Sequence, residues 1–280
     1  MEKISDIELN RRLYRRKQTI RSVIISGISL IIFATVIYII LANSKGWAIV
    51  QSTFFDGKTF IDSIYPVFLG LLVNLEILVF ASIGVAIVAT LLALARTIKS
   101  PLFFPLKLFS TVYTDLFRGV PLIIILYLIG FGVPALGFFG RINPIILGAI
   151  SIIIVYSAYV AEVIRAGIEA VHPSQRDAAR SLGLSHARTM WLIVLPQGIK
   201  KVIPALMNDF IAMQKDVGLC SILGAVDAVK VAQIDTALDF NYTHYVVAGL
   251  MFVALGFPFI RITNWYAKKA KEREEKGGSV

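Results

Sequence analysis

Residues 22–42 read SVIISGISLIIFATVIYIILA, which is 21 consecutive positions without a charged side chain. At about 1.5 Å per residue, a helix of this length measures about 32 Å and can cross a hydrocarbon core of about 30 Å. Basic residues precede the stretch, as they do in a signal peptide, but the apolar part of a signal peptide has only about 7–15 residues. We therefore interpret residues 22–42 as a membrane-spanning helix.

Five further apolar stretches have the length of a membrane span, at residues 67–95, 102–130, 142–164, 202–226 and 243–260. The composition agrees, because 57% of the residues are hydrophobic and only 16% are charged, whereas a soluble globular protein has about 25% charged residues. A single cysteine, Cys220, and three scattered histidines exclude a disulfide framework and give no metal site. The sequence therefore predicts an all-α membrane protein with six transmembrane helices.

Lys and Arg lie on alternate sides of these six spans. The N-terminal tail, the loops 96–107 and 165–201, and the tail from Arg261 together hold 22 of the 28 Lys and Arg residues. Cytoplasmic loops carry an excess of these residues, so the pattern predicts that both termini lie in the cytoplasm. We assign the net charge of +10 to contact with the membrane surface, and we expect no nucleic acid partner.

The cytoplasmic loop 165–196 carries the signals of a short, stiff helix. Ser174 is placed to cap this helix, and Asp177 follows three residues later, in the spacing of a capping box. Gly183 is placed to end the helix, as the C′ residue often does. The loop is therefore predicted to be ordered.

A second short helix is predicted from Ser185 through Trp191, after which Leu195-Pro196 closes the unit and starts the next span. A capped helix that is tethered by two spans can transmit a push in either direction, whereas a floppy loop cannot. We therefore interpret the loop as the element that couples the spans to a soluble motor.

The loop also resembles a known motif. Residues 177–196 follow the pattern EAA(x3)G(x9)IxLP of the EAA loop in binding-protein-dependent ABC importer permeases, with Asp177 in place of Glu. The resemblance implies that this cytoplasmic coupling helix docks into a groove on a separate ATPase. The residues implied as the contact surface are Arg176, Asp177, Ala178, Ala179, Gly183 and Leu184.

Other residues resemble the polar amino acid branch of that family over residues 66–266. They include Arg118-Gly119-Val120-Pro121 (similar to RGTP), Ala161-Glu162 with Arg165 and Gly167 (similar to AExxRxG), Leu195-Pro196-Gln197 with Pro204 and Asn208, and Lys215-Asp216 (similar to the start of KDTS, with Val217-Gly218 in place of Thr-Ser). The resemblance implies a type I ABC permease core of five helices, to which the first span is an addition.

Four parts of the chain follow from this likeness. They are a basic cytoplasmic tail (1–21), an extra N-terminal transmembrane helix with its outer loop (22–65), the permease domain (66–266) and a charged cytoplasmic tail (267–280). The resemblance implies a multi-pass protein of the bacterial cytoplasmic membrane that takes an amino acid as substrate. It implies as partners two ATPase subunits that bind ATP and Mg, a second permease copy or a sister permease, and an extracytoplasmic solute-binding protein, with no cofactor and no catalytic residue in this chain.

Asp209, Met213 and Asp216 are spaced i, i+4, i+7 and so share one face of the fifth span. Charges at membrane depth are costly and usually face the interior of a bundle or a substrate pathway. Two carboxylates on one face could hold the ammonium group of an amino acid or a cationic side chain, which would suit a polar or cationic amino acid. Asp216 could equally pair with Lys215 or with another subunit, and the sequence leaves both readings open.

Arg118 and Glu162 lie near the cytoplasmic ends of the third and fourth spans, where they could form a structural ion pair or a gate. Pro121 is predicted to kink the third span. Asn74 and Glu76 lie in the outer half of the second span, and the sequence does not separate a role in the pathway from one in packing.

The chain has no glycine-rich phosphate loop GxxxxGK[ST], because its nearest string, Asp56-Gly57-Lys58-Thr59, has Ser52 at the upstream glycine position. The motor must therefore be another chain. An ion-gradient-driven secondary transporter would also have six spans and buried carboxylates, but it usually has inverted repeats, which are not visible here. A membrane enzyme is disfavoured, since no histidine is placed beside a nucleophile. The sequence thus predicts the permease subunit of an ATP-driven amino acid importer.

Overall fold

The structure, a computed structural model, describes residues 6–98, 100–138 and 140–277. All elements of these residues are helical, and five helices are long and apolar enough to cross a membrane, or six if one bent pair counts as a single span. The expected all-α membrane fold is confirmed. The ends of both predicted tails, residues 1–5 and 278–280, lie outside the described residues.

Contacts divide the chain into two units, residues 1–55 and 56–280. The first unit contains α1 (Asp6–Ala42) and α2 (Trp47–Phe54). Helix α1 includes the whole predicted span 22–42 but begins earlier, so the described basic residues ahead of the span continue the same helix. Helix α2 occupies part of the segment that was expected to be an outer loop.

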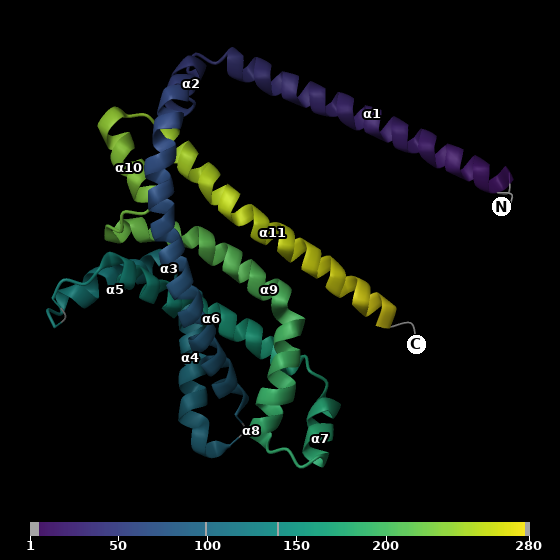
Figure 1. Ribbon diagram of the computed structural model, residues 1–280, viewed down its shortest axis with the longest axis vertical. Coiled ribbons are helices and arrows are strands. Elements are labelled where there is room, and N and C mark those ends of the chain that lie inside the picture. Colours follow the sequence, from purple (N-terminus) through teal and green to yellow (C-terminus); the bar gives the residue numbers. More distant parts are fainter. Residues whose placement is uncertain (1–5, 99, 139, 278–280) are drawn as a thin grey trace. The chain divides into compact units, whose positions relative to one another are not determined.

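The second unit is built on α3 (Gly57–Thr97), which packs along α6 (Pro144–Glu169) (Figure 1). Helix α3 begins ten residues ahead of the predicted span because Asp56 caps it: the backbone N–H of Thr59 donates to the Asp56 carboxylate at 2.7 Å. Small residues such as Ala81 and Ala89 lie buried in the core that α3 shares with α6. They let the two helices approach closely, as small residues do in membrane bundles.

The third predicted span is broken. A short 3-10 turn, η1 (Pro101–Phe103), leads into α4 (Phe104–Gly119), and α5 (Leu122–Ala135) follows at an angle of 107°. Val120 is extended ahead of Pro121, as the residue before a proline usually is. The kink predicted at Pro121 is confirmed, and it is large enough to make two helices of one span.

The cytoplasmic loop contains α7 (Pro173–Ser181) and α8 (His186–Thr189), and α8 runs without a break through the π-helical turn η2 (Met190–Val194) into α9 (Leu195–Asp216). The prediction that the second short helix ends at Trp191 is therefore wrong. Pro196 has no N–H to donate to the turn before it, and the widened π turn lets the helix continue past this missing hydrogen bond.

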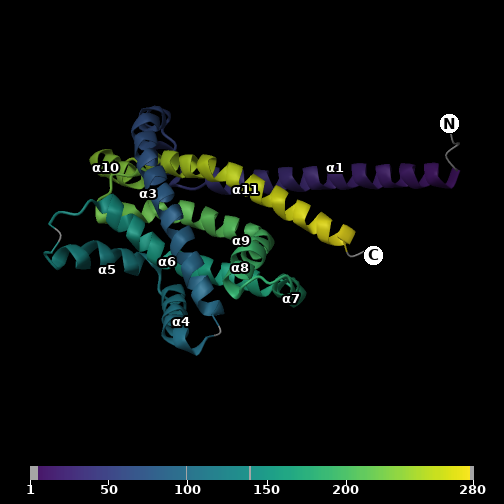
Figure 2. The ribbon, with the colours of Figure 1, turned by 60° about the horizontal axis from the view of Figure 1, so that its bottom comes forward.

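After α9 the chain forms η3 (Val217–Leu223), α10 (Ala228–Asp239) and α11 (Thr243–Gly277). Helix α10, which the sequence analysis did not anticipate, packs against both α3 and α11 (Figure 2). Asp227 caps it by accepting a hydrogen bond of 2.8 Å from the backbone N–H of Lys230. Helix α11 continues through most of the segment that was predicted as a charged tail.

Asn74 anchors the start of α10 to α3. Its amide nitrogen donates to Asp227 Oδ2 at 3.0 Å, and its amide oxygen accepts from the backbone N–H of Ala228 at 3.0 Å. Asn74 is fully buried, whereas Glu76 is exposed. Asn74 therefore has a role in helix packing, and Glu76 does not share it.

Candidate functional site

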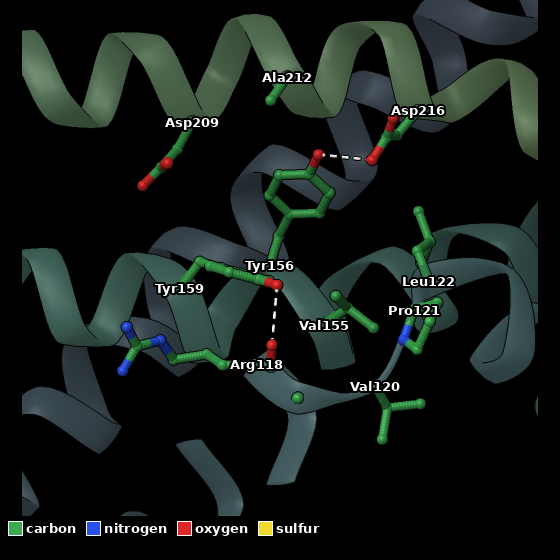
Figure 3. Close-up of a pocket in the computed structure, with 11 residues that line it drawn as sticks. Arg118, Val120, Pro121, Leu122, Val155, Tyr156, Tyr159, Asp209, Ala212 and Asp216 are labelled. Carbon is green, nitrogen blue, oxygen red and sulfur yellow. Dashed lines mark hydrogen bonds between the residues drawn. The ribbon is translucent and has the colours of Figure 1, made fainter. Parts of the chain in front are cut away.

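A cavity of about 420 Å³ lies where the broken span meets α6 and α9 (Figure 3). The break supplies one side of it and the two helices supply the other. Its lining residues are Arg118, Gly119, Val120, Pro121 and Leu122 from the break, Val155, Tyr156 and Tyr159 from α6, and Asp209, Ala212 and Asp216 from α9. The cavity thus gathers both carboxylates that the sequence analysis singled out, together with Arg118.

The break at Val120-Pro121 places two helix ends in the cavity wall. The last carbonyl groups of α4 and the first N–H groups of α5 have no partner within their own helices, and they carry partial negative and positive charge respectively. Tyr159 Oη satisfies one of these groups by donating to the carbonyl oxygen of Arg118 at 3.0 Å. Pro121 provides no side-chain cap for α5. Broken helices of this kind suit the binding of a small molecule that carries both charges.

Asp209 and Asp216 lie on the side of α9 that faces α6, as their spacing predicts. Asp216 Oδ2 accepts a hydrogen bond of 2.7 Å from Tyr156 Oη, while Lys215 is exposed (Figure 3). Asp209 Oδ2 is buried, and within the described part of the chain it has no hydrogen-bond partner. An unpartnered carboxylate oxygen in a cavity wall is a ready acceptor for a ligand donor.

Met213 is 4% exposed and lies on the same helix face. It does not line the first cavity but a second one of about 260 Å³, which it shares with Asp209 and Tyr156. Asp209 therefore lies where the two cavities meet.

Tyr156 and Tyr159 line the cavity but are not among the site residues predicted from the sequence. Both occur in the apolar helix α6, with Ser157 and Ala158 between them, and both hydroxyl groups bond across to a neighbouring helix. A buried tyrosine hydroxyl usually needs a partner, so two tyrosines in the middle of a span were an available signal.

The predicted pairing of Glu162 with Arg118 is corrected by the structure. Among the described residues, Glu162 bonds to Arg96 at 2.6 Å and to Arg165, which reaches both of its oxygens. Arg96 also donates to Thr114 Oγ1 at 3.0 Å, so the cluster joins α3, α4 and α6. Arg96 belongs to the last turn of α3, 66 residues before Glu162 in the sequence, and no local spacing signals this contact.

Residues 170–194, here named the coupling segment, are held against the helices that flank them. Arg176 Nη2 donates to the carbonyl oxygen of Ile168 at 2.8 Å, and Lys201 Nζ donates to the carbonyl oxygen of Ala170. Ala179 of α7 is buried. These contacts make the segment an ordered part of the bundle.

The end of α7 has the predicted form. Gly183 has a φ of +81°. Its N–H donates to the carbonyl oxygen of Arg180 at 2.9 Å, and the N–H of Leu184 donates to the carbonyl oxygen of Ala179 at 3.2 Å. This is the Schellman arrangement, with glycine at C′. Ser185 caps α8 as expected.

The start of α7 differs from the prediction. His172 is the N-cap, and its Nδ1 accepts from the backbone N–H of Ser174 at 3.3 Å. Pro173 takes the first helical position, where its missing N–H costs nothing, and this moves the cap ahead of Ser174. Asp177 therefore has no capping-box partner.

The outward face of α7 carries a residue that the sequence analysis did not name. Leu182 is 84% exposed at the end of the helix, and Asp177 and Ala178 are exposed as well. Of the predicted contact residues, Ala179 is buried and Arg176 is half-buried against α6. A large apolar side chain directly before the glycine that ends the helix was the sequence signal that could have identified Leu182 as a contact residue.

Comparison with known proteins gives one family and several relatives. Residues 100–272 match the family described as binding-protein-dependent transport system inner membrane component. The inner membrane amino-acid ABC transporter permease protein YhdY of Escherichia coli (strain K12) is 36% identical over 200 residues, which are 69% of this chain but only 54%, about half, of that protein. The arginine transport system permease protein ArtQ of Bacillus subtilis (strain 168) is 33% identical over 188 residues, covering 66% of this chain and 84% of ArtQ.

The fold is also similar to that of a solved structure. A chain in the crystal structure of an amino acid ABC transporter with histidines superposes with a TM-score of 0.68 at 31% sequence identity. The match covers 76% of this chain and 98% of that one.

Proposed function

Because the chain belongs to the family of binding-protein-dependent transport system inner membrane components, we propose that it is the permease subunit of an ATP-driven amino acid importer. The family resemblance seen in residues 177–196 is thereby confirmed. Support for the substrate class comes from the relatives, since YhdY is named as an amino-acid permease and ArtQ as an arginine permease. The alternative, a secondary transporter, has no such support.

One observation carries the proposal for this chain: the cavity at the break combines acceptors for an ammonium group with donors for a carboxylate. Asp209 has a buried, unpartnered oxygen, and Arg118 and the first turn of α5 line the same cavity. A free amino acid carries both charges on one carbon. In the proposed pose its ammonium group lies at Asp209 and its carboxylate at Arg118.

The structure of the coupling segment supports the proposal that transport is driven by a separate ATPase. In our proposal, two separate ATPase subunits bind ATP and Mg and hydrolyse the ATP, and they dock on the outward face of α7 through Ala178, Leu182 and Gly183. Closure of the ATPases pushes α7, and the contacts of Arg176 and Lys201 carry that push to α6 and α9. The path then alternates between an inward-facing and an outward-facing state.

The remaining partners and the orientation follow the family. We propose that the chain pairs with a second copy or with a sister permease, and that a solute-binding protein delivers the amino acid from outside. Both termini lie in the cytoplasm, in keeping with the 22 Lys and Arg residues on that side. The unit formed by residues 1–55 is proposed as an addition to the five-helix core, since the contacts within the chain separate it from residues 56–280.

Transport in liposomes tests the proposal. The chain, reconstituted with its ATPase and binding protein, is expected to take up amino acids only when ATP is supplied. Uptake by the chain alone on a proton or sodium gradient would instead show a secondary transporter. Unaltered substrate-stimulated transport after Asp209→Asn and Asp216→Asn together would refute the proposed substrate site.

A further inference from the structure

A third cavity, with a polar lining, lies at the end of the bundle that holds the coupling segment. It has a volume of about 350 Å³ and is lined by residues from the ends of α3, α4 and α6 and from α7, α8 and η2. Its charged or titratable lining residues are Arg96, Lys107, Glu169, Arg176, Asp177, Arg180 and His186. The cavity is separate from the one at the break, with which it shares no residue.

Positive charge is in excess in this cavity. Arg96 and Glu169 already have partners, because Arg96 pairs with Glu162 and Glu169 pairs with Arg165. Three cations remain, Lys107, Arg176 and Arg180, against the single carboxylate of Asp177. Within the described residues, Lys107 and Arg180 have no ion-pair partner, and the only acceptor of the Arg176 guanidinium is the carbonyl of Ile168. A cavity with this balance attracts an anion.

Two buried polar atoms in the wall add a specific signal. Thr189 is only 3% exposed, yet in the described part of the chain its Oγ1 has no hydrogen-bond partner. The same is true of Arg176 Nε, which is also buried. Nearly all buried polar groups in proteins have a partner, so a hydroxyl and a guanidinium N–H left without one in the same cavity indicate a missing acceptor.

We propose that this cavity binds a phosphate group, supplied by the headgroup of an anionic phospholipid in the adjacent leaflet. A phosphate offers several anionic oxygens, which match the fork of Arg176 together with the Thr189 hydroxyl, while Lys107 and Arg180 add positive charge. Basic pockets between membrane helices on the cytoplasmic side are suited to such headgroups. The assignment of the leaflet rests on the orientation proposed above, whereas the phosphate chemistry does not.

The site leaves the proposed ATPase surface free. Arg176 and Arg180 are four residues apart and share one face of α7, while Ala178 and Leu182 form another pair four residues apart on a different face. A bound phosphate would link α7 to α3 and α4 from the membrane side. It would thereby stiffen the coupling segment without covering Leu182.

Lipid binding to the purified full-length chain tests this site. The chain is delipidated in a neutral detergent and titrated with short-chain phosphatidylglycerol, with phosphatidylcholine of the same chain length as the comparison. We expect saturable binding of phosphatidylglycerol and much weaker binding of phosphatidylcholine. Lys107→Gln and Arg180→Gln are each expected to weaken phosphatidylglycerol binding roughly tenfold. Arg188→Gln removes an exposed arginine of α8 outside the cavity and should leave the affinity unchanged.

Thr189→Val separates ligand contact from folding. The hydroxyl has no partner in the described part of the chain, so this nearly isosteric change should not lower the melting temperature of the lipid-free chain, although it weakens phosphatidylglycerol binding. Inorganic phosphate distinguishes the source of the group. Failure to displace the lipid assigns the site to a headgroup, whereas phosphate binding with the same sensitivity to the variants assigns it to a soluble phosphate compound. Equal binding of both lipids, wild-type affinity in the Lys107 and Arg180 variants, or an equal loss in Arg188→Gln would overturn the proposal, and none of these results depends on transport.

Discussion

Gly167 of α6 and Gly198 of α9 face each other where the two helices cross. A Cβ atom on Gly167 would lie 2.6 Å from the carbonyl oxygen of Gly198, and one on Gly198 would lie 2.9 Å from the carbonyl oxygen of Gly167. Gly167 lies three residues before the coupling segment, and Gly198 lies four residues after it. The crossing therefore fixes both ends of that segment at one point, so that a push on α7 moves α6 and α9 together.

Gly167→Ala is expected to destabilise the chain, because backbone atoms, which cannot rotate away, block the new methyl group. We expect a loss of about 1–3 kcal/mol in the free energy of unfolding, measured by thermal unfolding in detergent. Gly249→Ala is the matched control, since Gly249 also lies in a helix but a Cβ atom there would have open space around it. Equal melting temperatures for the two variants would rule out the tight crossing.

Glu162→Gln should also destabilise the chain, since it leaves Arg96 and Arg165 without their shared carboxylate. Hydrogen bonds to charged groups contribute about 1.5–3 kcal/mol, and partial exposure of this cluster lowers the expected loss to about 1–2 kcal/mol. A double-mutant cycle with Arg96→Gln should show that the two losses are not additive. The same cycle with Arg118→Gln should be additive, and strong coupling to Arg118 would restore the pairing that the sequence suggested.

Asn74→Ala tests the joint between α3 and α10. It leaves a buried oxygen of Asp227 and the N–H of Ala228 without partners, and each such group costs about 1–3 kcal/mol. We expect thermal unfolding at a clearly lower temperature and faster hydrogen exchange in α10. Glu76→Gln, an exposed change on the same helix, should have neither effect. Unchanged exchange in α10 after Asn74→Ala would argue against the joint.

Asp209→Asn should weaken binding of the transported amino acid roughly ten- to hundredfold, because the ammonium group loses a charged acceptor. The measurement is equilibrium binding of a panel of radiolabelled amino acids to the purified chain. Lys215→Gln alters an exposed charge on the same helix and serves as the control. Equal affinities in the two variants would place the ammonium group elsewhere.

Local signals in the sequence were sufficient for much of this fold. Hydropathy located the spans, and Gly183 and Ser185 act within one turn of the helix ends that they define, so their roles could be predicted. The start of α7 was misjudged because His172 and Ser174 compete for the cap, and the proline between them decides the outcome.

Contacts between distant residues were beyond such reasoning. Glu162 pairs with Arg96 of another helix, and Asp216 accepts a hydrogen bond from Tyr156, because the packing of α3, α6 and α9 brings these groups together. No spacing along the chain encodes that packing. The two carboxylates of the candidate site could therefore be predicted from the sequence, whereas their hydrogen-bond partners could be identified only from the structure.

The account depends most directly on Leu182, which we propose as the apolar contact between α7 and the ATPase. Substrate-stimulated ATP hydrolysis, measured in liposomes that hold the complete importer with Leu182→Asp, tests this contact. We predict that stimulation and uptake are both lost, whereas Leu182→Met and Leu238→Asp, a change at a similarly exposed leucine of α10, keep both. Full stimulation in the Leu182→Asp importer would contradict the claim that α7 couples the membrane helices to the motor.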